Sequence, residues 1–245
     1  MNLDTDFMLS DFPTVFAALP STLLLSLDSM LWALVFALIC GGAQLAKISV
    51  LDKVTLVINT FIKGIPLVVQ LLFCYYAVPY VVKWFDGLTG RAYDPRHLPY
   101  FGAAVLALAL NFGAYITDVV ISSARAVDKG QWESAYACGM TRFQALRRIV
   151  APQIAVISLP NMTNYFIWLL KGTSLASIVN VTEMLTTARL SASDGYQFLE
   201  AYIDAAVIYW IVCACIEWAS GRLYRSAGRY LASPSGGASQ HSNRS

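Results

Sequence analysis

The segment LPYFGAAVLALALNFGAYIT, residues 98–117, decides the fold of this chain. It carries no charged residue, and Asp118 follows it directly. An α-helix needs about 20 mostly apolar residues to cross a bilayer. The apolar residues form a continuous run and do not alternate with a period of two, as they would in a strand of a membrane barrel. The segment therefore predicts a membrane-spanning helix.

The composition of the whole chain agrees with a membrane protein. Apolar residues make up 57% and charged residues 13% of the 245 residues, against roughly 45–50% and about 25% in soluble domains. The mean hydropathy is +0.57. The formal net charge of +2 leaves no basic excess of the kind that nucleic-acid binding requires. We therefore expect an integral membrane protein that binds no nucleic acid.

Four further segments on either side of the first are apolar enough to cross a bilayer. They are residues 23–46, 54–82, 149–170 and 196–218. The last is the least regular, because Glu200, Asp204 and Glu217 bracket its uncharged stretch. Continuous apolar runs favour helices over a barrel. The sequence thus predicts an all-α integral membrane protein with about five transmembrane helices.

The positions of the basic residues predict the orientation. With the N-terminus outside, eleven Lys and Arg lie beside the spans on the inner side and five on the outer side, which agrees with the positive-inside rule. We expect an extracytoplasmic segment over residues 1–19, a transmembrane domain over 20–230, and a cytoplasmic C-terminus. We expect the tail 231–245 to be disordered and cytoplasmic, because its part from Ser233, SPSGGASQHSNRS, lacks apolar mass.

A hairpin is predicted between the third and fourth spans, in DKGQWESAYACGMTRFQALRRIVAP, residues 128–152. Residues 129–138 favour a short helix that Gly139 ends, and Thr141 can cap a second helix that runs through Arg148. Ala135 and Gly139 share one edge of the first helix, where another protein could approach closely.

The chemistry of this hairpin permits two interpretations. Trp132 and Tyr136, four residues apart, form an aromatic ridge beside the small residues, which suits a rigid knob that docks a partner protein. An amphipathic loop on the lipid surface is the alternative, because three arginines would favour it equally. These are Arg142, Arg147 and Arg148.

The residues of the hairpin resemble the cytoplasmic signature of type I ABC importer permeases. That signature reads Glu-Ala-Ala, three residues, Gly, nine residues and Ile-x-Leu-Pro. Here Glu133-Ser134-Ala135 is followed after three residues by Gly139 and after nine more by residues 149–152, Ile-Val-Ala-Pro. Ser134 and Ala151 depart from the pattern, and both changes are small.

The resemblance narrows to the polar-amino-acid branch of this family and covers about residues 20–230. The motif Arg-Gly-Thr-Pro-Leu-Leu-Val-Gln of that branch is similar to KGIPLVVQ at 63–70. Asn-x-Gly-Ala-Tyr before a carboxylate is matched at 111–115 and Asp118. Pro-Lys-Gly-Gln-Trp-Glu is similar to DKGQWE at 128–133. Leu-Leu-Lys-Asp-Thr-Ser-Leu is similar to LLKGTSL at 169–175.

The resemblance implies partners and a location. These are a cytoplasmic ABC ATPase dimer that holds the Glu-Ala-Ala helix in a cleft, an extracytoplasmic amino-acid-binding protein, a second permease subunit, identical or related, and the lipid of a prokaryotic cytoplasmic membrane. The chain has no GxxxxGK[ST] loop, so it should not be an enzyme. We expect no directly bound cofactor, with ATP and Mg on the partner ATPase. The coupling residues are then Glu133, Ser134, Ala135 and Gly139, with Arg147 and Arg148 as helpers that membrane anchoring explains as well.

Polar residues within the spans should mark the substrate path, since a charge in hydrocarbon is costly unless it faces a cavity or a partner. Lys63 is the first candidate, because Gly64 and Pro66 weaken the helix beside it and its ammonium suits a carboxylate. It could also snorkel to the cytoplasmic face. Gln70 could line the same path or pack against a helix. The other candidates are Asn111, Tyr165, Lys171, Gly172 and Ser174.

Two departures from the family pattern bear on the substrate. Many related permeases carry a glutamate and an aspartate where this chain has Tyr165 and Gly172. Without these acids, a neutral polar, dipolar or aromatic amino acid is a better substrate than arginine, lysine or histidine. Asp118 is expected to brace helices, and Asp28 and Glu183 have no assigned role.

Two other classes of function fit the sequence less well. A secondary transporter or channel would share the broken second span and Lys63, but five spans offer no internal repeat of the usual kind. An intramembrane enzyme would need catalytic groups within the spans. His97 and His241 both lie outside them, and neither HExxH nor GxSxG occurs.

Overall fold

The computed structural model describes residues 3–90 and 98–231, and all elements of this part of the chain are helices. The α-helices are α1 (Thr5–Ala17), α2 (Leu19–Leu45), α3 (Ser49–Gly64), α4 (Leu67–Thr89), α5 (Tyr100–Ala126), α6 (Lys129–Ala137), α7 (Arg142–Ala145), α8 (Ala151–Gly172), α9 (Met184–Ser191) and α10 (Phe198–Leu231). A π-helix, η1 (Leu146–Val150), precedes α8, and a 3₁₀-helix, η2 (Thr173–Val179), follows it.

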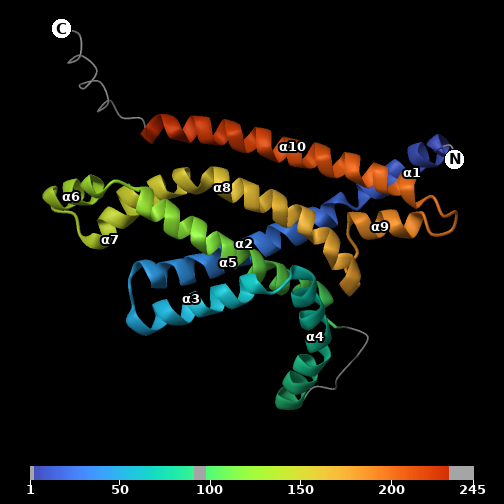
Figure 1. Ribbon diagram of the computed structural model, residues 1–245, viewed down its shortest axis with the longest axis horizontal. Coiled ribbons are helices and arrows are strands. Elements are labelled where there is room, and N and C mark those ends of the chain that lie inside the picture. The colour runs from blue at the N-terminus through green and yellow to red at the C-terminus, as the bar shows by residue number, and fades with distance from the viewer. Residues whose placement is uncertain (1–2, 91–97, 232–245) are drawn as a thin grey trace, which may run out of the picture.

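The long helices form an elongated bundle (Figure 1). Helices α2, α5 and α10 run along it in one direction and α3 and α8 in the other. The short helices α6 and α7 lie at one end of the bundle, and α1 and α9 lie at the opposite end. Helix α4 leaves the bundle at a steep angle. The C-terminal end of α10 lies at the α6–α7 end, opposite α1.

Helix α5 is the centre of the bundle and packs most extensively against α2. Small residues allow this close approach. A Cβ at Gly113 would lie 2.9 Å from a ring carbon of Phe36 and 3.1 Å from the backbone oxygen of Ala33. Any side chain at Gly113 would therefore force α5 away from α2.

Four of the described segments are long and apolar enough to cross a membrane. They are Thr5–Leu45, Leu67–Thr89, Tyr100–Ala126 and Phe198–Gly228. Helix α8, predicted as a span over 149–170, has 22 residues, and about 33 Å of helix is long enough to cross. It falls outside the four because Gln153, Asn161 and Asn164 lower its hydropathy. The all-α membrane fold is confirmed, while α8 is more polar than the predicted span 149–170 implied.

The second predicted span, 54–82, is divided between α3 and α4. Ile65 is extended, with φ −101° and ψ 129°, because the residue before a proline is disfavoured in the helical region. Pro66 also lacks the N–H that a continuous helix would need. The expected weakening at Gly64 and Pro66 is thus a complete break.

The two ends of the chain differ in detail from the predicted segments. The predicted N-terminal segment 1–19 contains α1, whose first turn is capped by Asp4. The last span begins close to its predicted start, but α10 continues past residue 218 to Leu231. The predicted tail 231–245 lies, apart from Leu231, outside the described residues.

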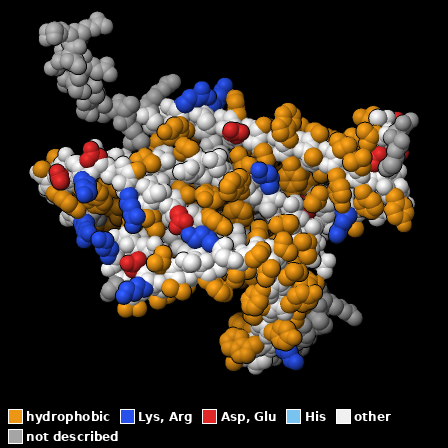
Figure 2. Space-filling model, viewed as in Figure 1, with side chains coloured by type: hydrophobic (Ala, Val, Ile, Leu, Met, Phe, Trp, Pro, Cys, Tyr) orange, Lys and Arg blue, Asp and Glu red, His pale blue; other side chains and the backbone are white. Residues whose placement is uncertain are grey.

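Apolar side chains cover much of the surface, as a bilayer requires (Figure 2). They are dense over α4 and over the end that carries α1 and α9, while Lys and Arg gather near α6, α7 and the turn between α2 and α3. Large side chains of α4 are more than half exposed: Phe73, Tyr76, Tyr80, Trp84 and Leu88.

Candidate functional site

The first half of the predicted hairpin forms as expected. Asp128 caps α6 by accepting a 2.8 Å hydrogen bond from the N–H of Gly130. The helix ends at Ala137, and Gly139 adopts a left-handed conformation with φ +76°. This conformation favours glycine, because a side chain would clash with the backbone. Gly139 is therefore the helix stop that the sequence predicted.

The second half begins with the predicted cap but continues differently. Thr141 and Gln144 form a reciprocal capping box, with hydrogen bonds of 3.3 and 2.9 Å. Helix α7 ends at Ala145, and the chain continues through the wider π-helix η1 into α8. The predicted helix through Arg148 thus contains a π-helical segment, which is a local distortion that sequence periodicity does not reveal.

The structure corrects the expected role of Ala135. Its side chain was predicted to lie on an edge open to a partner protein, but it is only 1% exposed. Helix α6 packs against α7 and η1, and Ala145 on α7 is also buried. These two small side chains let the hairpin close on itself. Gly139 remains exposed, with nothing within 4 Å of the position its Cβ would occupy.

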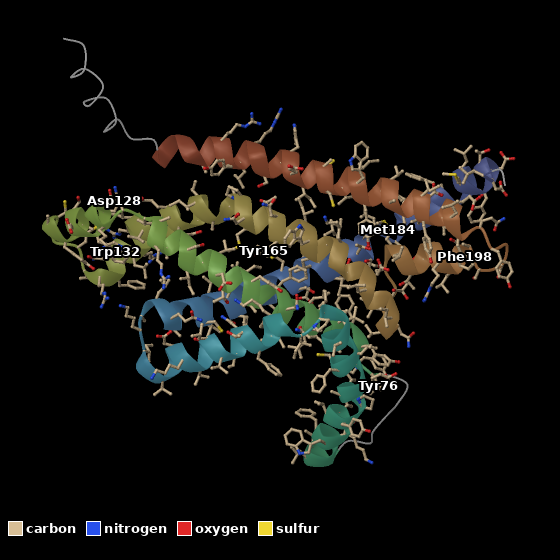
Figure 3. All side chains as sticks on the ribbon, in the orientation of Figure 1. Tyr76, Asp128, Trp132, Tyr165, Met184 and Phe198 are labelled. Carbon is tan, nitrogen blue, oxygen red and sulfur yellow. The ribbon has the colours of Figure 1, made fainter. Side chains whose placement is uncertain are left out.

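The other predicted coupling residues lie on the surface of the hairpin: Glu133, Ser134, Arg147 and Arg148 are exposed. Trp132 and Tyr136 form the expected ridge, with ring centroids 6.1 Å apart. Figure 3 shows Asp128 and Trp132 at the end of the bundle opposite Phe198. The hairpin and its candidate coupling residues therefore lie at one extreme of the molecule.

Sequence reasoning missed the most exposed apolar side chain of the hairpin. Phe143 is 69% exposed, and Tyr136 and Leu146 are also more than a third exposed. The available signal was the position of Phe143 directly after the capped start of α7, where a first-turn side chain has no neighbouring turn to cover it. Exposed apolar groups among arginines suit either a protein partner or a lipid surface.

A second group of predicted residues surrounds the break between α3 and α4. The Gln70 side-chain amide donates hydrogen bonds to the carbonyl oxygens of Ile62, at 2.7 Å, and Ile65, at 3.1 Å. These carbonyls lie in the last turn of α3 and at the break, where the helical partners are missing. Gln70 therefore supplies hydrogen bonds to backbone carbonyls that the break leaves without helical partners. The sequence did not predict this role.

Lys63 has a charged partner. Its Nζ lies 2.8 Å from Oδ2 of Asp118 on α5. The side chains are 26% and 62% exposed, so the pair is accessible and is not sealed in the core. Asp118 therefore braces α5 against α3, as expected, while the ammonium of Lys63 is paired where the sequence suggested a free group.

Aromatic side chains lie beside this pair. Tyr165 stacks on Tyr115 with ring centroids 5.9 Å apart and meets Trp168 edge-on. The charges of Asp118 and Lys63 both act on the Tyr165 hydroxyl. Figure 3 places Tyr165 near the middle of the bundle. Here the structure brings together residues of α3, α5 and α8.

Gly172 and Asn111 lie in the packed part of the same region. A Cβ on Gly172 would lie 3.4 Å from the ring of Phe112 and 3.5 Å from Leu67, which is ordinary contact. Asn111 is buried in α5 beside Phe112 in sequence. A small side chain at Gly172 would fit, and a larger one would have to displace these neighbours.

Lys171 and Ser174 lie apart from this group. They line a cavity of about 500 Å³ with residues of α9 and α10. The Ser174 hydroxyl donates to the carbonyl oxygen of Lys171 at 2.7 Å. Three aromatic residues of α10 also line the cavity, namely Tyr202, Tyr209 and Trp210. The predicted substrate residues thus divide between two places.

Glu183, for which the sequence suggested no role, is a fully buried cap. Its carboxylate accepts hydrogen bonds from the backbone N–H groups of Leu185, at 2.9 Å, and Thr186, at 2.7 Å. The Tyr209 hydroxyl of α10 donates to it at 3.0 Å. These bonds attach the start of α9 to α10.

An all-helical bundle that spans the membrane, breaks its second span and carries a capped hairpin at one end defines a class of multi-pass transport components. The chain belongs to the family described as the binding-protein-dependent transport system inner membrane component, whose model matches residues 33–229.

The chain is also similar to individual proteins that are named as amino-acid permeases. The chain is 31% identical over 230 residues to the probable amino-acid ABC transporter permease protein PatM of Vibrio harveyi, covering 92% of this chain and 99% of that protein. It is 35% identical over 224 residues to the L-cystine transport system permease protein TcyB of Bacillus subtilis, covering 91% and 90%.

A solved structure agrees with these relatives. The crystal structure of an amino acid ABC transporter with histidines matches with a TM-score of 0.75 and 27% identity, over 92% of this chain and 100% of that one. The resemblance to amino-acid ABC permease subunits and the type I importer-like fold are thereby confirmed.

Proposed function

We propose that this permease subunit moves a neutral polar, dipolar or aromatic amino acid into a prokaryotic cell, driven by ATP hydrolysis on a separate ATPase dimer. The observation that carries the coupling proposal is the capped hairpin α6–η1, which presents exposed apolar and charged side chains at one end of the bundle. We place this end in the cytoplasm and α1 outside.

The local structure of the hairpin favours a protein partner over a lipid surface. Two caps, the left-handed Gly139 and the buried Ala135 and Ala145 fix its shape. A preformed shape reduces the entropy lost on docking. The exposed carboxylate of Glu133 adds an acid that anionic lipid headgroups would repel.

The substrate proposal rests on the charges around the break. The carboxylate of this region, Asp118, is already paired with Lys63. A cationic side chain would find no free carboxylate there, whereas a neutral or aromatic one could pack on Tyr115 and Tyr165. The relative TcyB is named for L-cystine, and GlnP of Escherichia coli, 27% identical, for glutamine.

The proposed assembly contains an extracytoplasmic amino-acid-binding protein and a second permease subunit, identical or related. ATP and Mg²⁺ would bind to the ATPase, and this chain would hold no cofactor. The exposed aromatic row of α4 offers a surface for either lipid or the second permease (Figure 2).

Reconstitution with the partner ATPase and binding protein tests the coupling proposal. Phe143→Asp should abolish substrate-stimulated ATP hydrolysis and uptake, because a charge would disrupt the apolar contact with the partner. Phe143→Leu keeps the apolar surface and should retain most of both activities. Full coupling in Phe143→Asp would refute the docking role of the hairpin.

The alternative is a secondary transporter or channel. Uptake into vesicles that contain the permease without any ATPase would support that alternative and contradict ATP-driven import. We expect no uptake in such vesicles, and uptake when the ATPase, the binding protein and ATP are supplied.

A further inference from the structure

Two buried carboxylates lie in neighbouring helices at the end of the bundle that carries α1 and α9. Asp11 of α1 is 5% exposed and Asp204 of α10 is 4% exposed. Helix α1 packs against both α10 and α9, and Figure 1 shows it beside the first turns of α10. The proposed transport function uses neither acid.

Contacts on both sides fix the register of the two helices. The Asp4 N–H donates to Oε1 of Glu200 at 3.1 Å, and Val15 packs in one buried cluster with Ile208. Asp11 lies between Asp4 and Val15, and Asp204 lies between Glu200 and Ile208. The two carboxylates therefore lie at the same level of the α1–α10 interface.

Each of these acids has a buried oxygen that no group satisfies. Oδ2 of Asp11 and Oδ2 of Asp204 have no hydrogen-bond partner. Buried polar atoms are normally paired, because an unpaired one loses its bonds to water without replacement. Two orphan oxygens at one level of one interface require a common explanation.

The charged groups on the surrounding helices do not neutralise the pair. On α8, Lys171 lines the cavity beside Ala205 and Ala206 of α10, but within the described residues it forms no ion pair with either acid. On α9, Glu183 is an acid already bound by donors, and Arg189 is exposed. On α10, Glu200 is a third acid, held by the Asp4 N–H. The ion pair recorded over residues 3–90 and 98–231 is Lys63–Asp118, which joins α3 to α5 and lies on other helices.

We propose that Asp11 and Asp204 share a single proton, and that the resulting carboxyl–carboxylate hydrogen bond clasps α1 to α10. The proton comes from water, and its O–H lies on one acid and points at Oδ2 of the other. One such bond satisfies both orphan oxygens and leaves a single negative charge in place of two. Loss of the proton restores two like charges and opens the clasp.

A bound metal ion is the competing explanation for two facing carboxylates. Within the described part of the chain, no group of three or more His, Cys, Asp and Glu side chains is arranged to hold one. Protein sites for divalent ions usually need more ligands than two carboxylates. A proton needs only the two oxygens that are present.

A thiol at position 15 reports on the clasp. Val15 is fully buried and lies one turn after Asp11. In the complete transporter, with the five native cysteines replaced, Val15→Cys is labelled with an impermeant maleimide. Its rate is divided by that of Leu9→Cys, an exposed position on the same helix. The ratio removes the effect of pH on thiol reactivity.

The wild-type pair and its amide variant should respond differently. As the pH rises, the ratio should rise by up to about tenfold per pH unit, because opening releases one proton, and it should level off once the clasp is open. In Asp204→Asn the ratio should stay low and independent of pH, because the amide donates to Asp11 permanently. An unchanged pH slope in Asp204→Asn would overturn the proposal. So would a ratio that depends on Na⁺ or Ca²⁺ at fixed pH.

Infrared spectroscopy provides a readout that does not require opening. The wild-type protein should show a protonated carboxyl band that is lost in both Asp11→Asn and Asp204→Asn. Asp6→Asn, at an exposed position of α1, is the control and should retain the band. If no protonated carboxyl band depends on Asp11 and Asp204, the shared proton does not exist. Neither result depends on the transported substrate, so the proposed function can fail independently.

Discussion

The ammonium of Lys63 lies 2.8 Å from Oδ2 of Asp118, and this pair ties the last turn of α3 to α5 directly before the chain breaks at Ile65. A lysine ammonium has three N–H donors, so a substrate carboxylate can bind Lys63 while Asp118 stays paired. Both side chains are partly exposed, so this approach needs no rearrangement of the core. The pair can therefore brace the helices and still leave donors for the substrate.

Double substitution separates these two roles. Lys63→Met and Asp118→Leu should each lower stability by about 1 kcal/mol, because a partly exposed pair contributes little. Lys63→Met should also abolish uptake. The combined variant removes both charges and should regain stability without regaining uptake, as measured by thermal unfolding and vesicle transport. Recovery of uptake in the combined variant would show that Lys63 only braces the helices and does not bind the substrate.

Gly139 should be sensitive to backbone conformation as well as to size. A side chain there has free space, but φ of +76° costs most residues about 1–2 kcal/mol. Gly139→Ala should weaken coupling, Gly139→Arg should abolish it in a normally inserted protein, and Gly139→Asn, which tolerates this φ, should do least harm. The rate of substrate-stimulated ATP hydrolysis in the three variants measures how strongly each one weakens coupling. Normal coupling in Gly139→Arg would contradict the docking assignment.

The proposed orientation can be tested at two described positions. Thr5 and Cys138 are exposed and lie at opposite ends of the bundle, in α1 and directly after α6. In intact cells, and with the other cysteines removed, an impermeant thiol reagent should label Thr5→Cys and spare Cys138. The reverse pattern would invert the topology. Permeabilised cells, where both should react, provide the control.

Glu183 should be among the most sensitive structural positions. The carboxylate is fully buried and bound by two N–H groups and by Tyr209. Glu183→Ala removes the cap and leaves buried donors unpaired, at a cost of about 3–5 kcal/mol. Tyr209→Phe removes one bond and should cost about 1 kcal/mol. Thermal unfolding compares the stabilities of the two variants. Equal, small losses of stability would show that the Glu183 cap contributes little.

The long helices and the hairpin could be predicted from the sequence, because each is specified by residues close together in the chain. Long, mostly apolar runs specify α2 and α5, and Gly139 and Thr141 mark a stop and a cap from their own backbone chemistry. The break at Pro66 follows from one residue type. Such features depend on neighbours within one turn of the chain.

Features that depend on distant partners could not be predicted with the same certainty. The burial of Ala135, the cap at Glu183 and the two bonds of Gln70 require knowledge of which helices meet. Residues adjacent in sequence also separated: Lys171 faces a cavity beside α10, while Gly172 contacts Phe112 and Leu67. Neighbouring residues of a helix point in directions about 100° apart. Two adjacent residues of one sequence motif can therefore contact different parts of the protein.

Gly172→Asp tests the proposed substrate preference most directly. A Cβ at this position fits beside Phe112 and Leu67, and the carboxyl group of an aspartate must displace these side chains. The aspartate would supply the acid that the family resemblance leads us to expect at this position. Because desolvated charge pairs can change affinity by about 1–3 kcal/mol, competition assays in vesicles should shift by about 10- to 100-fold toward arginine or lysine. Gly172→Ala adds the same Cβ without the charge and should keep the wild-type preference. Wild-type transport restricted to basic amino acids would count decisively against the proposed site, because it would show that a cationic side chain needs no acid at Gly172.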